Sequence, residues 1–135
     1  MHSAALAITL LALCAGCATG GPAGAPPPPD EFQPYAGPAV DEFRYFTLDG
    51  WEVVDRYRVV LWVDVTSAYL ITVRPPCVDL DFTERLGVSS TLHVISRFES
   101  LFPKRQEPCP IEEIRPLDVK RMRADRAAAK RAAKP

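Results

Sequence analysis

The stretch RVVLWVDVTSAYLITVR, residues 58–74, is the part of this sequence that says most about its fold. Residues 58–64 are almost continuously apolar, which is typical of a central strand buried on both faces. Thr66-Ser67 indicates a turn. Residues 68–74 then alternate, and Pro75-Pro76 removes two ladder donors, so we expect this second strand to stop there. The alternation places one set of side chains on a common face: Tyr69, Ile71 and Val73.

Shorter runs on either side extend the β pattern. Asp49-Gly50 is a strong hairpin signal and predicts a turn between residues 44–48 and residues 51–54. Residues 80–86 fit one or two helical turns, with Gly87 as the C-terminal cap. Two more strands are predicted. The first, residues 92–98, sets Leu92, Val94, Ser96 and Phe98 opposite His93, Ile95 and Arg97, and the second covers residues 111–114.

About six short strands and one short helix within residues 41–117 predict a mostly β domain. In a chain of 135 residues there is room for one domain at most. Closing the sheet would limit exposed strand edges, so we expect a small barrel or sandwich. The pattern does not predict the strand order.

The first residues fit a targeting segment, residues 1–16, rather than a membrane span. From Ala4 to Gly16 the chain is apolar apart from Thr9, and such a run is shorter than the roughly 20 residues that a membrane-spanning helix needs. Leu13-Cys14-Ala15-Gly16-Cys17 resembles the lipobox of bacterial lipoproteins, in which small residues precede a cysteine that receives the lipid. The resemblance implies a lipid on Cys17. The alternative is ordinary cleavage after Ala18, which releases a soluble periplasmic protein.

Residues 17–40 are predicted to be the lipid anchor, at Cys17, followed by a proline-rich tether. Seven prolines lie between Gly20 and Pro38, with glycine and alanine between them. Such a stretch cannot form a packed core and favours extended polyproline conformations, so we interpret it as a spacer.

The last eighteen residues, 118–135, differ from the rest in charge. Residues 1–117 contain nine basic and fifteen acidic residues, whereas the tail has seven basic residues against Asp118 and Asp125. It is rich in alanine, lysine and arginine and should be helix-prone. Its apolar face is thin, so we expect a solvated helix or a frayed tail that is dispensable for folding. A functional alternative is a basic helix that meets anionic lipid or another acidic polymer, or that folds back on the acidic body. The basic residues are Lys120, Arg121, Arg123, Arg126, Lys130, Arg131 and Lys134.

Cys77 and Cys109 are predicted to form a disulfide. Cys14 leaves with the signal and Cys17 takes the lipid, so these two remain in a chain destined for an oxidising compartment. The alternative is two separate buried thiols.

The order and spacing of several short motifs resemble a family of small Gram-negative envelope lipoproteins that is classed only as a domain of unknown function. Family members have two further cysteines, which would lie near Glu42 and Ile95, and this chain lacks both. The resemblance implies an envelope location and supports the disulfide, but it implies no activity. The residues that carry it are Gly50-Trp51, Asp55, Tyr69-Leu70, Pro76-Cys77, Leu80, Gly87-Val88-Ser89, Phe98-Glu99 and Cys109-Pro110-Ile111 to Ile114.

Three groups of residues are candidates for chemistry, each with a simpler structural interpretation. The acids Asp79, Asp81 and Glu84 could hold a hard cation, but helix N-capping and complementarity to the dipole of the first helical turn are the favoured interpretations. His93 could join Ser89 or Ser90 in a hydrolase, yet no catalytic motif surrounds them. Aromatic side chains could line a ligand groove, although strand aromatics more often belong to a core. These are Trp51, Tyr57, Trp62 and Tyr69.

The sequence therefore favours a non-enzymatic lipoprotein of the outer membrane whose β domain binds or supports an envelope protein or polymer. The alternative is a periplasmic hydrolase. We expect no cofactor, no metal and, because of the compartment, no nucleic acid as partner.

Overall fold

The computed structural model describes residues 30–103 and 107–135. Within them the chain is mostly β, as predicted, with eight strands, two 3-10 turns and one α-helix. Residues 1–29, and with them the signal and Cys17, lie outside the described part. The elements are η1 (Gln33–Tyr35), β1 (Glu42–Arg44), β2 (Gly50–Asp55), β3 (Arg58–Trp62), β4 (Ala68–Val73), η2 (Leu80–Phe82), β5 (Gly87–Val88), β6 (Val94–Ser96), β7 (Ser100–Phe102), β8 (Cys109–Leu117) and α1 (Val119–Ala132).

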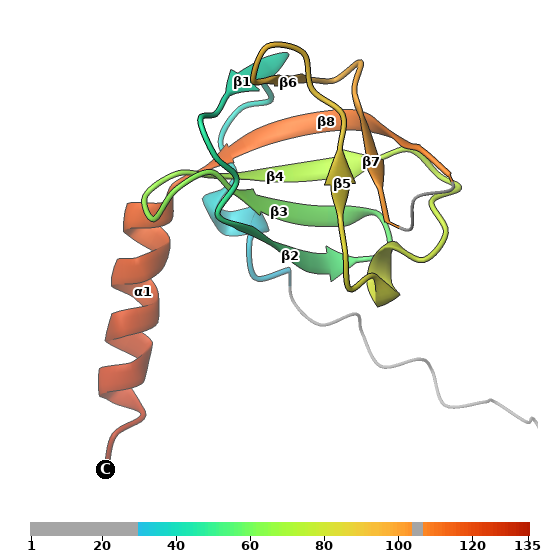
Figure 1. The fold of residues 1–135 in the computed structure, drawn as a ribbon. Helices are drawn as coiled ribbons and strands as arrows, with labels where there is room; N and C mark the ends of the chain where they lie inside the picture. Colours follow the sequence, from blue (N-terminus) through green and yellow to red (C-terminus); the bar gives the residue numbers. More distant parts are fainter. Residues whose placement is uncertain (1–29, 104–106) are drawn as a thin grey trace, which may run out of the picture.

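Six of the strands form one antiparallel sheet in the order β2-β3-β4-β8-β7-β5. The sheet curls into a half-barrel, and β1 and β6 form a separate antiparallel pair at one end of it (Figure 1). Helix α1 extends away from the sheet (Figure 1).

The predicted central strands are confirmed. β3 lies between β2 and β4, and β4 lies between β3 and β8. Val59 pairs with Ile71, and both are fully buried in the core on the concave face, which Tyr69 and Val73 also contact. Neighbouring side chains such as Val60 are buried in a second cluster on the opposite face. Burial on both faces explains the continuous apolar run that starts this part of the sequence.

Strand β8 is longer than the predicted residues 111–114. A β-bulge in the β4–β8 pairing shifts the register, so that Val73 opposes Ile111 while Thr72 opposes Glu113. The extra residue lets Ile111 and Ile114, three positions apart, both reach the same core. An inserted residue breaks the alternation of buried and exposed side chains along the strand. The alternation in the sequence therefore predicted only the middle of β8.

The hairpin predicted at Asp49-Gly50 is wrong. Gly50 opens β2, and the Asp49 amide donates to the Trp62 carbonyl, which extends the β2–β3 ladder. The hairpin turn instead lies between Asp55 and Arg58, where the Asp55 carboxylate accepts a hydrogen bond from the backbone N–H of the intervening Tyr57. Strand β1 pairs with β6, a long-range partner that a local turn signal cannot reveal.

Two other local predictions need correction. The helical segment is a single 3-10 turn, η2, and Gly87 does not cap it, because this glycine starts β5 and has no positive φ. The strand predicted at residues 92–98 contains only the three residues of β6, since Leu92 and His93 form a turn. Strands β5 and β7 were not predicted; each has three residues or fewer.

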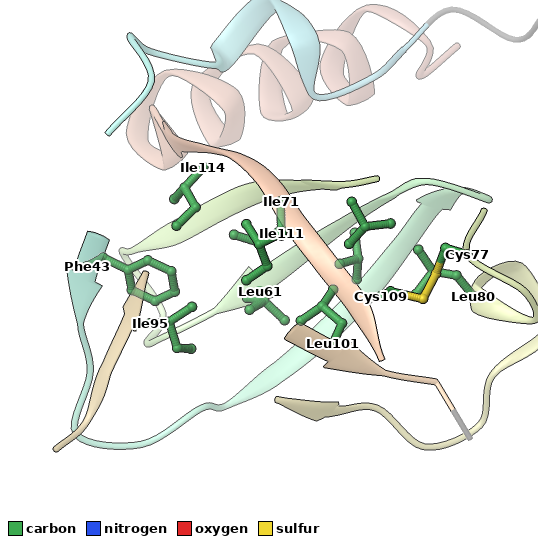
Figure 2. Close-up of a cluster of buried hydrophobic side chains, with 12 residues drawn as sticks. Phe43, Leu61, Ile71, Cys77, Leu80, Ile95, Leu101, Cys109, Ile111 and Ile114 are labelled. Atoms are coloured by element: carbon green, nitrogen blue, oxygen red, sulfur yellow. A yellow bond between two sulfur atoms is a disulfide. The ribbon is translucent and has the colours of Figure 1, made fainter. Parts of the chain in front are cut away.

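The β1–β6 pair closes the concave face. Phe43 and Ile95 extend from it into the core that contains Leu61 and Ile71 (Figure 2). The Phe43 ring stacks on Tyr69 with centroids 3.9 Å apart. The disulfide joining Cys77 and Cys109 lies at the other end of the same cluster (Figure 2).

The opposite face of the sheet is covered by the two ends of the described chain. Phe32, ahead of η1, and Val119 and Met122, on the first turn of α1, are buried against Val60 and Leu70. Residues 30–40, predicted as tether, thus contact the sheet, and the tail is not entirely solvated. Beyond its first turn the helix is exposed.

Candidate functional site

The serines considered for a hydrolase are bonded to other groups. The Ser89 hydroxyl donates directly to a Glu99 carboxylate oxygen at 2.5 Å, and its oxygen accepts from the Ser100 amide at 2.9 Å. Thr91 donates to the other carboxylate oxygen of Glu99 at 3.3 Å. These bonds tie β5 and the segment after it to the start of β7. A serine nucleophile needs a general base, usually histidine, as its acceptor.

His93 does not supply that base here. Its exposed ring lies edge-on to Tyr45, with centroids 5.7 Å apart, and the Tyr45 hydroxyl shares a 2.6 Å hydrogen bond with Ser90. Within residues 30–103 and 107–135, no hydrogen bond links the His93 side chain to a serine or a carboxylate. The three residue types of a hydrolase are near one another in sequence but are not joined in a catalytic chain.

The acids around η2 take up the predicted first-turn position but not the predicted N-capping role. Asp79 occupies the N-cap position with φ 68°, but its side chain makes no capping hydrogen bond, so the N-capping interpretation is wrong. Asp81 lies in the first turn. In the described part of the chain, no group of three or more histidine, cysteine, aspartate or glutamate residues is arranged to hold a metal ion.

The four aromatic residues proposed for a ligand groove all pack against a core, and two of them also line a surface hollow. Tyr57 and Tyr69 are half-buried against the concave core. Trp51 and Trp62 also pack against the two cores, but both line a hollow of about 510 Å³ near the start of β2. The other residues that line this hollow are Asp49, Gly50, Glu52, Asp64, Val65 and Arg123.

The hollow is mainly acidic. Hydrogen bonds from the side chain and backbone of Thr66 hold the pKa of the Asp64 carboxyl below its usual range, so this carboxylate stays ionised at neutral pH. Arg123 of α1 is the one cation among its lining residues. The arrangement can hold a small cationic or hydroxylated group, and it also brings the helix close to the sheet.

A second hollow, of about 390 Å³, lies where residues 39–41 run beside β8, with Val40 bridged to Ile114. It contains Glu113, whose pKa is lowered by a 2.8 Å hydrogen bond from Arg115. It also includes Arg97, which forms an ion pair with Asp41 at 3.6 Å. Because these charges are already paired, the second hollow is the weaker binding candidate.

The feature that sequence analysis missed is the turn before β6. Thr91 and Val94 exchange two backbone hydrogen bonds, of 3.2 and 2.9 Å, around Leu92 and His93. These two residues have φ values of 52° and 60°. Positive φ at both central positions is what a type I′ turn requires, and such turns favour Asn-Gly. Leucine and histidine give no turn signal, so the sequence could not show it.

The same end of the molecule exposes large apolar side chains. Leu92 is 87% exposed, and Phe46, which follows β1 at the same end of the β1–β6 pair, is 97% exposed. Phe98, just beyond the opposite end of β6, is 86% exposed. We call Leu92 and Phe46, which lie at the same end of the β1–β6 pair, the apolar rim. Together with the strained turn, the rim is the best-defined candidate for a binding surface on the β domain.

Comparison with known proteins shows the family but no activity. Residues 1–133 match the Family of unknown function (DUF6491). No curated protein and no solved structure matches the chain. None of the described helices is both long and apolar enough to cross a membrane. The chain therefore belongs to DUF6491, a family of unknown function.

Proposed function

Since membership of this family brings no activity with it, we propose from sequence and geometry that the protein is a non-enzymatic cell-envelope lipoprotein. A lipid on Cys17 holds it to the outer membrane, and its β domain binds an envelope protein. The lipobox-like Ala15-Gly16-Cys17 sequence supports the anchor. The strained Leu92-His93 turn, which presents an exposed leucine, carries the binding part of the proposal.

If Cys17 carries the lipid, the mature protein should begin at this residue with the added mass of its acyl groups. Several acyl chains at about 0.8 kcal/mol per buried methylene give stable membrane attachment. Mass spectrometry of the protein extracted from membranes is expected to find acyl groups on Cys17 as the first residue. A chain that begins unmodified at Thr19 would show that the protein is released as a soluble periplasmic form.

Backbone strain at an exposed leucine points to a protein partner. A residue other than glycine in the left-handed region costs about 1–2 kcal/mol, and such conformations concentrate at functional sites. Apolar groups on a surface contribute to binding when a partner buries them, and protein interfaces have apolar centres. The apolar rim supplies such a centre with Phe46 and Leu92, next to the two-stranded β1–β6 pair.

Replacing Leu92-His93 with Asn-Gly is expected to stabilise the fold and weaken binding. Asparagine and glycine adopt positive φ at lower cost, so the free energy of unfolding should rise by about 2 kcal/mol. Leu92→Ala keeps the strained backbone and is the matched control, with nearly unchanged stability because the side chain is exposed. Urea unfolding of both variants measures this. A lower stability for the Asn-Gly variant would contradict the turn geometry.

Photocrosslinking in intact cells tests the partner. A photoreactive amino acid at position 92 of the lipidated protein is expected to capture a defined protein, and the capture should disappear with Phe46→Ser. The same amino acid at Arg56, exposed in the β2–β3 turn, is the control position and should capture nothing. Equal capture from both positions, or none from position 92, would refute binding through the apolar rim.

A further inference from the structure

Helix α1 has an exposed basic face, of which Arg123 also lines the hollow near the start of β2. Of its six basic residues, Arg121 lies 4.0 Å from Asp125 and over the Tyr35 ring, and Arg126 forms an ion pair with Glu31. The other four form no ion pair within residues 30–103 and 107–135. All four are exposed: Lys120, Arg123, Lys130 and Arg131.

These four cations share one side of the helix. At about 100° of rotation per residue, they fall within an arc of roughly 100°. Arg121 and Asp125 lie outside that arc, and so do the buried Val119 and Met122. We call the four residues the basic stripe. One-sided clustering of unpaired charge along about 17 Å of helix fits an extended anionic surface better than a small ligand.

The start of the described chain lies beside this helix. Tyr35 donates a hydrogen bond to Asp125 at 3.1 Å, and Arg126 lies over the Phe32 ring with its guanidinium 5.6 Å from the centroid. Cys17 precedes Asp30 by thirteen residues, a length that spans at most about 45 Å when fully extended. A lipid on Cys17 would therefore keep the helix close to the membrane surface.

We infer that the basic stripe of α1 docks on the anionic phospholipid surface of the membrane that holds the protein; the membrane's proximity rests on the proposed lipid at Cys17. Two observations favour a phospholipid surface as the partner of the basic stripe. One is charge complementarity, and the other is the position of the tether beside the helix. Apart from the buried Val119 and Met122, the apolar residues of the helix are alanines, which give little apolar area to insert among acyl chains. Docking is therefore electrostatic and sensitive to salt.

Vesicle binding by the unlipidated chain tests the inference independently of the anchor. The mature protein with Cys17→Ser, exported behind an ordinary cleavable signal, is mixed with vesicles of phosphatidylglycerol and phosphatidylcholine or of phosphatidylcholine alone. It is expected to bind only the first, and less at high salt. Each Lys or Arg near an anionic membrane contributes about 1 kcal/mol, roughly a fivefold change in affinity, so K120Q/R123Q/K130Q/R131Q should bind at least about one hundredfold more weakly.

The control variant removes the same charge elsewhere. R44Q/R56Q/R74Q/R85Q changes four exposed arginines of the β domain and is expected to retain vesicle affinity within about threefold, apart from the nonspecific effect of net charge. Equal loss in the two variants would overturn the inference. So would a chain that ignores anionic vesicles but binds a soluble polyanion through the same four residues. A failure to find lipid on Cys17 would refute the anchor and leave this binding result unchanged.

Discussion

Replacing both Cys77 and Cys109 with alanine is expected to lower the free energy of unfolding by about 3.5 kcal/mol. The bridge closes a loop with a sequence separation of 32 residues. Chain-entropy estimates for a loop of this size give a stabilisation of that order. Both cysteines are also buried in the concave core, next to Leu80 and Ile111, so the change loosens its packing. A domain this small has few other sources of stability.

Urea unfolding of the exported Cys17→Ser chain and its double-alanine variant measures the loss. Wild-type cysteines under reducing conditions are the control, and their stability should fall by a similar amount because the same cross-link is removed. A thiol assay on the denatured, unreduced chain should find neither cysteine free. Two free thiols at Cys77 and Cys109 would favour the alternative of separate buried cysteines.

Truncation after Leu117 is expected to destabilise the fold by about 3 kcal/mol. It removes Val119 and the fully buried Met122, which pack on Phe32 and Leu70. Full burial of such a side chain contributes about 1.5–3 kcal/mol, from which the ordering of the helix subtracts. This outcome is opposite to the expectation from the sequence, in which the thin apolar face of the tail suggested that it is dispensable.

Truncation after Arg126 is the matched comparison. It keeps the docked first turn, the Asp118 cap on the Arg121 amide, and the contacts of Asp125 and Arg126 with the start of the chain. Its free energy of unfolding should stay within about 0.5 kcal/mol of the full chain, because the residues removed are exposed. A large loss from this shorter cut, or none from the longer one, would contradict the docking of α1.

The sequence by itself determined the features that depend on neighbouring residues. The apolar run of residues 58–64 and the alternation of residues 68–74 identified the two central strands, because the spacing of apolar residues along a short segment indicates both strand structure and burial. The Pro75-Pro76 stop, the β class and the helical tendency of the tail follow from residue preferences of the same kind. The cysteine inventory, combined with the expectation that Cys14 is removed and Cys17 lipidated, predicted the Cys77–Cys109 disulfide that the structure has.

Only the tertiary structure decided which distant segments pair. Strand β1 joins β6 across about fifty residues and thereby overrides the Asp49-Gly50 hairpin signal, because a favourable local turn yields when a long-range pairing buries Phe43 and Ile95. The bulge in the β4–β8 pairing arises from register, which no single strand specifies. The docking of Met122 needs a cavity built by other elements. The positive φ at Leu92 and His93 contradicts their own preferences, so the surrounding β1–β6 pairing must impose it.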